Sequence, residues 1–584
     1  MEKSKGNSYI KAIAYMLTFA LLIISNESFA VEPPPVPDAT AIGSVQPGRI
    51  SGQVMNQGPT QPTGIAPPLK HEEEKAQNPL GAAASKIKFK LMNVILEDNT
   101  VYSDEQLLPI YKDKLNTVIT IVQLQEIVQS ITNFYRNNGY ILSRAILPPQ
   151  HVKNGVVKIR ILEGSLAQVK VIGHPHGAKY IVQDYGQHIV ESKPLKLDVM
   201  EKYLRIANEV PGTQVKAVLE PAKTQSVASD LNLATENTIF NGFLSYDNYG
   251  TRYIGPQQFT LGGTLNSIFL SGDTTRATYV TTARPKELKF SDLFYEMPLG
   301  TEGLRMSLDG NFSATNPLYF LQGLIVSGTA TSYTLNFSYP YIRSHSASLS
   351  FQGGGNYLDS YVSQLNQELY SDHTRSVNAG INYDFADRYQ GANSLMGRFE
   401  QGLPILGATS NNHSHFTSRY GATGLYSKVY FQMTRLQGLF WKFTGVATLK
   451  GQYSFNPLLS SAQFGFGGPQ LGRGYDPAEI IGDRGIAGSL ELRLDLNPEL
   501  YLMQAIQLYV FYDLGETWNL RNVQPGTDTI LNAISAGGGA RITLIKNLSG
   551  NFMIAQPLTR QVQSLQLIGN GKRSRVLFSI TASV

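Results

Sequence analysis

Apolar and polar residues alternate with a period of two through most of the second half of the chain, from about residue 238 to residue 584. In the run GSLELRLDL (488–496) every second residue is leucine, and the residues between are mostly polar or charged. Glycine, asparagine, aspartate and serine separate such segments. This alternation predicts β-strands with one apolar and one polar face. Two architectures fit: a sandwich that buries the apolar face, or a barrel that turns it toward lipid.

The amino terminus favours the barrel. Three lysines precede or flank an apolar run, Ala12–Ile24, and small residues follow as far as Ala30. This order predicts a secretory signal peptide over residues 1–30. No later stretch reaches the roughly 18 uncharged apolar residues that a membrane helix needs. An exported chain that spans a membrane without such a helix must do so as a closed barrel.

The aromatic content agrees with this interpretation. The chain has 31 Tyr and 26 Phe against 2 Trp, and aromatic residues form the girdles of membrane barrels. At roughly 22 residues per strand and loop, residues 238–584 predict a transmembrane antiparallel β-barrel of about sixteen strands.

Composition argues against several other functions. The net charge is only +5 and no long basic run occurs, so we expect no nucleic-acid partner. The chain has no cysteine, which excludes disulfides and thiolate metal sites. We find no serine-hydrolase, zinc-protease or phosphate-loop motif and therefore expect no enzyme, cofactor or metal. The pairs His174/His176 and His413/His415 lie in apparent loops, where solvation is the simpler expectation.

The first half of the chain divides into three parts after the signal peptide. Residues 31–85 are rich in Pro and Gly and predict a linker. Residues 86–165 predict a small α+β module with the order β-α-α-β-β. Its expected elements are strands over 87–96, 140–147 and 155–164, a helix from Asp104 to about Lys114, and a helix that begins after Thr120. Residues 166–237 predict a second module with the same order.

One loop interrupts the barrel pattern. In LGRGYDPAEIIGDRG (471–485), Arg473 stands between two glycines, which let the backbone pass close to another segment. In QLYVFYDLG (507–515), alternation places Asp513 on the polar, lumenal face. Composition alone favours an exposed Arg473 and an ordinary lumenal Asp513. The alternative is an inward-folded loop in which the two side chains form a bidentate ion pair.

The motifs support this alternative, because they resemble those of a known family. LGRGY (471–475) and FYDLG (511–515) resemble the RGY loop motif and the F-x-D-x-G strand motif of the barrel-assembly and secretion superfamily. FYRNNGYILSRAILPPQHVKNGVVKIRILEG (134–164) is similar to the first POTRA domain of two-partner secretion transporters, the ShlB/FhaC/HecB family of haemolysin secretion and activation proteins. SYDNYGTRYIG (245–255) resembles that family's entry to the barrel. Residues 38–58 match only loosely the helix that often plugs such barrels, and glycines disfavour a helix there.

The resemblance implies a function and a set of residues. It implies two periplasmic POTRA domains, at 86–165 and 166–237, and an outer-membrane barrel in a Gram-negative cell. The barrel, inserted by the barrel-assembly machinery among outer-membrane lipids, exports a large exoprotein such as a haemolysin or adhesin and in some members activates it. The alternatives are a barrel-assembly factor and a porin-like channel. By resemblance, the loop–barrel contact comprises Arg473, Gly474, Tyr475, Phe511, Asp513 and Gly515, and the cargo-binding surface of the first POTRA domain comprises Tyr135, Arg136, Gly139, Tyr140, Pro148, Pro149 and Gln150.

Overall fold

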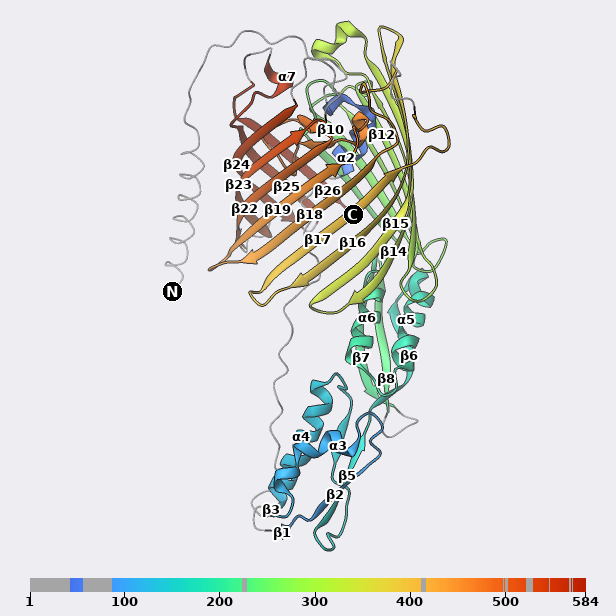
Figure 1. Ribbon diagram of the computed structural model, residues 1–584, viewed down its shortest axis with the longest axis vertical. Helices are drawn as coiled ribbons and strands as arrows, with labels where there is room; N and C mark the ends of the chain where they lie inside the picture. The colour runs from blue at the N-terminus through green and yellow to red at the C-terminus, as the bar shows by residue number, and fades with distance from the viewer. Residues whose placement is uncertain are drawn as a thin grey trace.

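A computed structural model describes residues 43–55 and 87–584, apart from 223–227, 411–415, 497, 499–502, 521–528, 546, 567–568 and 570. Two small α+β modules lead into a large barrel (Figure 1). The expected signal peptide, most of the predicted linker and the pair His413/His415 lie outside the described residues. His174 and His176 stack on each other with ring centroids 6.5 Å apart.

Sixteen antiparallel strands close into the barrel, as the alternation predicts. Neighbours in the chain are neighbours in the wall, except that β19 pairs with β22, and β26 closes the ring on β9. The strands are β9 (Phe240–Asp247), β10 (Gln258–Asn266), β11 (Thr274–Thr282), β12 (Leu288–Pro298), β13 (Arg305–Thr315), β14 (Ser327–Arg343), β15 (Ala347–Gln364), β16 (Gln367–Ala386), β17 (Gly391–Gly402), β18 (Ser427–Gly438), β19 (Phe443–Ser454), β22 (Arg484–Leu496), β23 (Ala505–Trp518), β24 (Ile530–Ile545), β25 (Leu548–Pro557) and β26 (Arg575–Ser583).

The apolar face of each strand points outward. On β23, Tyr512 and Leu514 are 43% and 44% exposed, whereas Asp513 between them is fully buried. The same order holds on β14, where Tyr333 and Phe337 are exposed. A wall that exposes its apolar residues and encloses its polar ones is the pattern of a membrane barrel. No helix among the described residues is long and apolar enough to cross a membrane.

The first module differs in detail from the expected elements. Its strands are β1 (Lys88–Lys90), β2 (Asn93–Glu97), β3 (Val118–Thr120), β4 (Arg144–Ile146) and β5 (Val156–Leu162), and its α-helices are α3 (Asp104–Leu107) and α4 (Ile121–Asn137). The strand expected over 87–96 is interrupted, because β1 pairs with β3 and β2 pairs with β5. The helix expected to reach Lys114 is wrong beyond Leu107, since Pro109 lacks the N–H of a continuing helix and short 3-10 turns follow. A tight turn at Tyr140–Ser143 shortens the next strand to β4.

The second module packs against the barrel. It comprises β6 (Ser165–His174), α5 (Lys179–Glu191), α6 (Leu197–Asn208), β7 (Thr213–Pro221) and β8 (Ala228–Asn237). The Tyr203 hydroxyl donates to Glu302 in the turn between β12 and β13 at 2.9 Å, and Arg343 pairs with Glu209 at 2.6 Å. These contacts mark one end of the barrel as the module end, and the loops that alternate with those turns lie at the opposite end.

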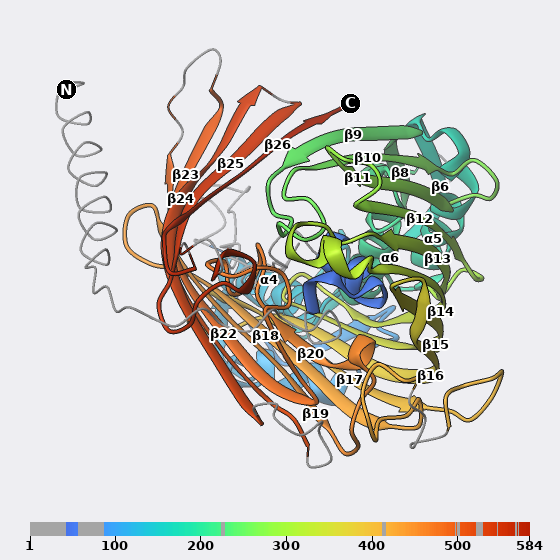
Figure 2. The same cartoon turned by 90° about the horizontal axis from the view of Figure 1, so that it is seen from above.

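A short segment near the amino terminus lies inside the ring of strands (Figure 2). It contains 3-10 turns η1 (Gly43–Val45) and η2 (Pro47–Arg49) and the helix α2 (Ile50–Met55). Its backbone carbonyl at Pro47 accepts a hydrogen bond of 2.8 Å from Ser313 on the inner face of β13. Val45 and Ile50 are buried. The helix covers only the end of the glycine-containing stretch, in agreement with the low helix propensity of glycine.

Candidate functional site

The loop between β19 and β22 folds back into the barrel. It carries the 3-10 turn η8 (Ser460–Ala462) and a hairpin of β20 (Phe464–Phe466) and β21 (Ile480–Gly482). Its apolar residues pack on the inner faces of β22 and β24 and on the segment between β25 and β26, in one buried cluster: Phe464, Phe466, Leu471, Tyr475, Ile480, Ala487, Ala533 and Val562. We call residues 455–483 the inward loop. This shared cluster fixes the inward loop in the lumen and holds the motif residues against the wall.

The inward loop delivers Arg473 to Asp513. The guanidinium donates from Nε to Asp513 Oδ2 at 3.0 Å and from Nη2 to Oδ1 at 2.8 Å, which is a bidentate pair. The backbone N–H groups of Gly472 and Arg473 also donate to Oδ2, at 3.1 and 3.0 Å. Asp513 therefore accepts hydrogen bonds from both the side chain and the main chain of the loop. The loop geometry depends on Gly472, whose φ of +84° favours glycine.

A second carboxylate shares the arginine. Arg473 Nη1 donates to Glu491 on β22, and Nη2 donates to Ser489 at 2.9 Å. Glu491 also binds Arg493 Nε at 2.7 Å and Arg541 Nη1 at 2.9 Å. Three guanidinium groups thus meet two carboxylates, and Arg473 and both carboxylates are buried. Buried charges of this kind are stable only when paired, so removal of one member leaves its partners uncompensated.

Aromatic rings and small residues complete the site. The Arg473 guanidinium lies 3.6 Å from the ring centroid of Phe511, in cation–π geometry. A Cβ atom on Gly515 would lie 2.4 Å from Phe466, and one on Gly474 would lie 2.7 Å from the Ser535 side chain. The Tyr475 hydroxyl donates to the Ile534 carbonyl at 2.9 Å. Each of the six residues predicted for the loop–barrel contact therefore lies at that contact.

The comparisons with known proteins agree with this fold and these motifs. The family model for haemolysin secretion/activation protein ShlB/FhaC/HecB matches residues 228–542, more than half of the chain. The chain belongs to this family. The ShlB-type POTRA model matches residues 89–164, so the first module is a POTRA domain. Family members are two-partner secretion transporters of the outer membrane, and the POTRA end of the barrel is therefore the periplasmic end.

Individual relatives are distant but cover most of the chain. The heme/hemopexin transporter protein HuxB of Haemophilus influenzae is 22% identical over 82% of this chain and 85% of its own. The outer membrane transporter CdiB of Dickeya dadantii is 24% identical over 77% of this chain and 79% of its own. Among solved structures, CdiB from Escherichia coli has a TM-score of 0.71 at 18% identity and covers 95% of this chain and 100% of its own. That similarity shows the shared fold.

Three of the residues predicted to bind cargo, Tyr135, Gly139 and Tyr140, make contacts that hold the POTRA domain together. Tyr135 is only 1% exposed, and its hydroxyl donates to Glu163 at 3.0 Å. Direct contact between Tyr135 and cargo stays a prediction, and in this conformation the ring lies in the domain core. Gly139 ends α4 at a φ of +91° and its carbonyl accepts the Leu197 N–H of the second module at 2.9 Å. Tyr140 packs edge-on against Tyr135.

The remaining predicted residues lie nearer the surface of the POTRA domain. Gln150 pairs through its side chain with the backbone of Lys158, at 2.7 and 2.8 Å, and so ties the Pro148–Pro149 turn to β5. Pro149 is exposed, and Arg136 is half-buried in the last turn of α4. Their role in cargo binding stays a prediction.

Sequence reasoning did not find Glu491, Ser489 and Arg541 as members of the Arg473 site. Alternation had already placed Ser489 and Glu491 on the polar face of their strand. The missing information was the register, which sets Ser489 opposite Asp513 and Glu491 opposite Phe511. A pattern within one strand predicts the face of a residue, but its cross-strand partner depends on the pairing of two strands.

Proposed function

We propose that the chain exports a large unfolded exoprotein from the periplasm to the cell surface, and that the Arg473–Asp513–Glu491 cluster latches the inward loop during the resting state. The observation that carries the latch is the buried bidentate pair between a loop residue and a wall residue. The chain that is exported needs the lumen that this loop occupies. We further propose that the protein has no enzymatic activity and that the barrel-assembly machinery inserts it among outer-membrane lipids.

The amino-terminal segment, residues 43–55, lies in the lumen beside the inward loop that carries the latch. Arg49, which ends η2, donates to the carbonyls of Ser460 and Gln463 in the inward loop, both at 2.8 Å. A Cβ on Gly43 would lie 2.5 Å from the Ala478 carbonyl, so the amino-terminal segment packs directly on the loop. Movement of the loop and of residues 43–55 is therefore coupled through these contacts. An exported chain has to displace both, which is the behaviour expected of a two-state gate.

The decisive experiment measures export. A candidate exoprotein with an amino-terminal secretion domain is expressed with the wild-type chain, with Arg473→Ala and with Arg484→Ala, and is then quantified in the medium. Arg484 is a suitable control because it also stacks on an aromatic ring, Tyr453, but contacts neither Asp513 nor Glu491. We expect Arg473→Ala to lower export and Arg484→Ala to retain it. Wild-type export by an Arg473→Ala barrel that still shows heat-modifiable migration would refute the latch.

Cargo recognition is assigned to the periplasmic modules. In the second module β7 pairs only with β8 among the described strands, so its other edge can accept an added strand. Val218 on β7 is 46% exposed. Because the chain has no cysteine, single cysteines report contacts cleanly. We expect Val218→Cys to crosslink to an export-arrested exoprotein more strongly than Tyr180→Cys, which lies 74% exposed on α5. Equal crosslinking at both positions would exclude this edge.

A barrel-assembly role is the alternative from a different class. It predicts that loss of this chain lowers the amounts of many outer-membrane proteins, whereas an export role predicts loss of one secreted protein. Quantification of the outer-membrane proteins in a deletion strain separates the two.

A further inference from the structure

The outer wall of the barrel is hollowed over β12–β16. The cavity has a volume of about 860 Å³, within the roughly 300–1,000 Å³ of small-molecule sites. Its walls include Leu293, Leu308, Phe312 and Tyr333, which are between 44% and 59% exposed. Exposed apolar residues on a membrane barrel point to lipid, so this cavity opens to the bilayer and not to the lumen. We call it the outer-wall hollow.

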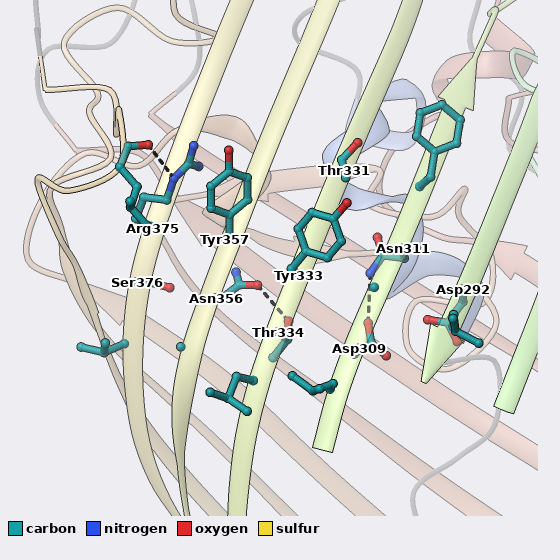
Figure 3. Close-up of a pocket in the computed structure, with 18 of the residues that line it drawn as sticks. Asp292, Asp309, Asn311, Thr331, Tyr333, Thr334, Asn356, Tyr357, Arg375 and Ser376 are labelled. Carbon is teal, nitrogen blue, oxygen red and sulfur yellow. Dashed lines mark hydrogen bonds between the residues drawn. The ribbon is translucent and has the colours of Figure 1, made fainter. Parts of the chain in front are cut away.

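A glycine on β15, Gly355, leaves room in the hollow. Register places Gly310, Tyr333, Tyr357 and Arg375 in one row across β13–β16. Figure 3 shows Tyr333, Tyr357 and Arg375 side by side on neighbouring strands. Gly355 stands two residues before Tyr357, on the same outer face of β15. A Cβ atom on Gly355 would meet only the Ser376 backbone carbonyl, at an ordinary contact distance of 3.7 Å, so no side chain from another strand covers this position. The missing side chain at Gly355 leaves a depression beside the Tyr333 and Tyr357 rings, which also line the hollow.

The loop after β17 forms another wall of the hollow. Leu403, Ile405 and Leu406 line it, and Ile405 and Leu406 are 49% and 72% exposed. Arg375 holds this loop, since its Nε donates to the Leu406 carbonyl at 3.1 Å. The Arg375 charge does not reach the lipid as a free charge. It pairs with Asp359 at 2.8 Å and lies 3.4 Å from the Tyr357 ring centroid, with a side chain only 4% exposed.

Cations lie beyond the hollow toward the extracellular end. On β12 the outward residue that follows Ser291 in that direction is Lys289, roughly 7 Å farther along the strand. Lys286 is exposed in the adjoining extracellular turn. Among the described residues, neither lysine has an acidic partner within salt-bridge distance, and the nearby Glu287 pairs with Arg284 at 3.5 Å. The wall therefore runs from an apolar hollow to unpaired positive charge.

We propose that the outer-wall hollow binds a phosphorylated lipid of the outer leaflet, of the lipopolysaccharide type, with an acyl chain in the hollow and a phosphate at Lys286 and Lys289. The order of apolar groove and cationic edge matches the order of acyl chain and headgroup in such a lipid. Lysines near a membrane surface attract anionic headgroups. This site rests on the outer-membrane location and not on the proposed latch.

The test uses two matched glycines. Gly353 and Gly355 lie on the same face of β15, but only Gly355 lines the hollow. A Cβ on Gly353 has its nearest neighbour at 3.5 Å, so both positions tolerate a side chain. The full-length barrel in detergent is titrated with lipopolysaccharide and, separately, with phosphatidylethanolamine, and bound lipid is counted by native mass spectrometry. Lys289→Gln tests the headgroup contact, with Lys572→Gln on a different extracellular loop as its control.

We expect lipopolysaccharide to bind more tightly than phosphatidylethanolamine. Gly355→Leu should weaken lipopolysaccharide binding by about tenfold through steric overlap, and Gly353→Leu should not. Lys289→Gln should weaken it by about fivefold, the effect of one interfacial lysine, and Lys572→Gln should not. Equal affinity for the two lipids, or equal binding by the two glycine variants, would overturn the proposal. So would a dimer that Gly355→Leu dissociates, because a second copy of the chain would then occupy the hollow.

Discussion

Two sets of motifs in this chain occupy different environments: one lies in the barrel lumen and the other in the core of the POTRA domain. The RGY and F-x-D-x-G motifs meet in the lumen, in a cluster of five charged groups of which four are buried. The Y-R-x-x-G-Y motif of the POTRA domain instead builds a core, in which a buried tyrosine donates to a single glutamate. The barrel site buries charged groups at positions where well-packed apolar residues would often make the fold equally stable or more stable. The comparison suggests that the first motif is kept for movement and the second for stability.

The largest effect is expected at Asp513. Asp513→Asn removes the charge that pairs bidentately with Arg473 and leaves the buried arginine with Glu491 alone. Loss of one partner from a buried ion pair costs about 3–5 kcal/mol. We expect the inward loop to detach, export to fall, and the loop to become sensitive to protease added to intact cells.

Asp495→Asn is the matched control for Asp513→Asn. Asp495 also lies on the polar face of a neighbouring strand, but it is exposed, and its carboxylate accepts a hydrogen bond from the Gln507 side chain at 2.7 Å. If both variants left the loop protected and export unchanged, the charge cluster would be a static support, and the contrast with the POTRA domain would disappear.

A smaller effect is expected at Gly515. Gly515→Ala places a methyl group within 2.4 Å of Phe466 and must displace the hairpin of the inward loop. Overpacking of this kind costs about 1–3 kcal/mol. The control is Gly488→Ala on β22, where the nearest atom to the new Cβ would be 3.6 Å away. Protease sensitivity of the loop should rise for Gly515→Ala only; equal protection in both variants would show that the hairpin yields without leaving the wall.

The two motifs also differ in how much of their structure the sequence predicts. The face of Asp513 follows from alternation, and the inward path of Arg473 followed only from the motif resemblance, since composition favoured an exposed residue. The shared role of Glu491 depends on strand register, which no single-strand pattern contains. In the POTRA domain, the helix start expected after Thr120 is confirmed, and a capping box between Thr120 and Gln123 fixes it. The break between β1 and β2 was missed, because the two halves pair with different strands.

The smallest effect is expected at Tyr135. Tyr135→Phe keeps the buried ring and removes one hydrogen bond to Glu163, which retains bonds from the Thr100 side chain and from the Thr100 and Val101 N–H groups. The expected loss is about 1 kcal/mol of POTRA-domain stability, measured by urea-dependent proteolysis of the full-length protein, with export unchanged. A loss of export at unchanged stability would give Tyr135 a direct role in cargo binding and would erase the contrast between the motifs.

The pH dependence of the same variant sharpens the test. Burial alone would raise the pKa of Glu163, but hydrogen bonds from Thr100, Val101 and Tyr135 outweigh burial and lower it. A carboxyl with a lowered pKa in the folded state stabilises the fold above its unfolded pKa of about 4.3 and loses that contribution as the pH falls through the folded value. The difference in urea midpoint between wild type and Tyr135→Phe should therefore be full at pH 7 and shrink below about pH 4. A difference that is the same at both pH values would show that the Tyr135 hydroxyl acts through packing and not through the ionised carboxylate.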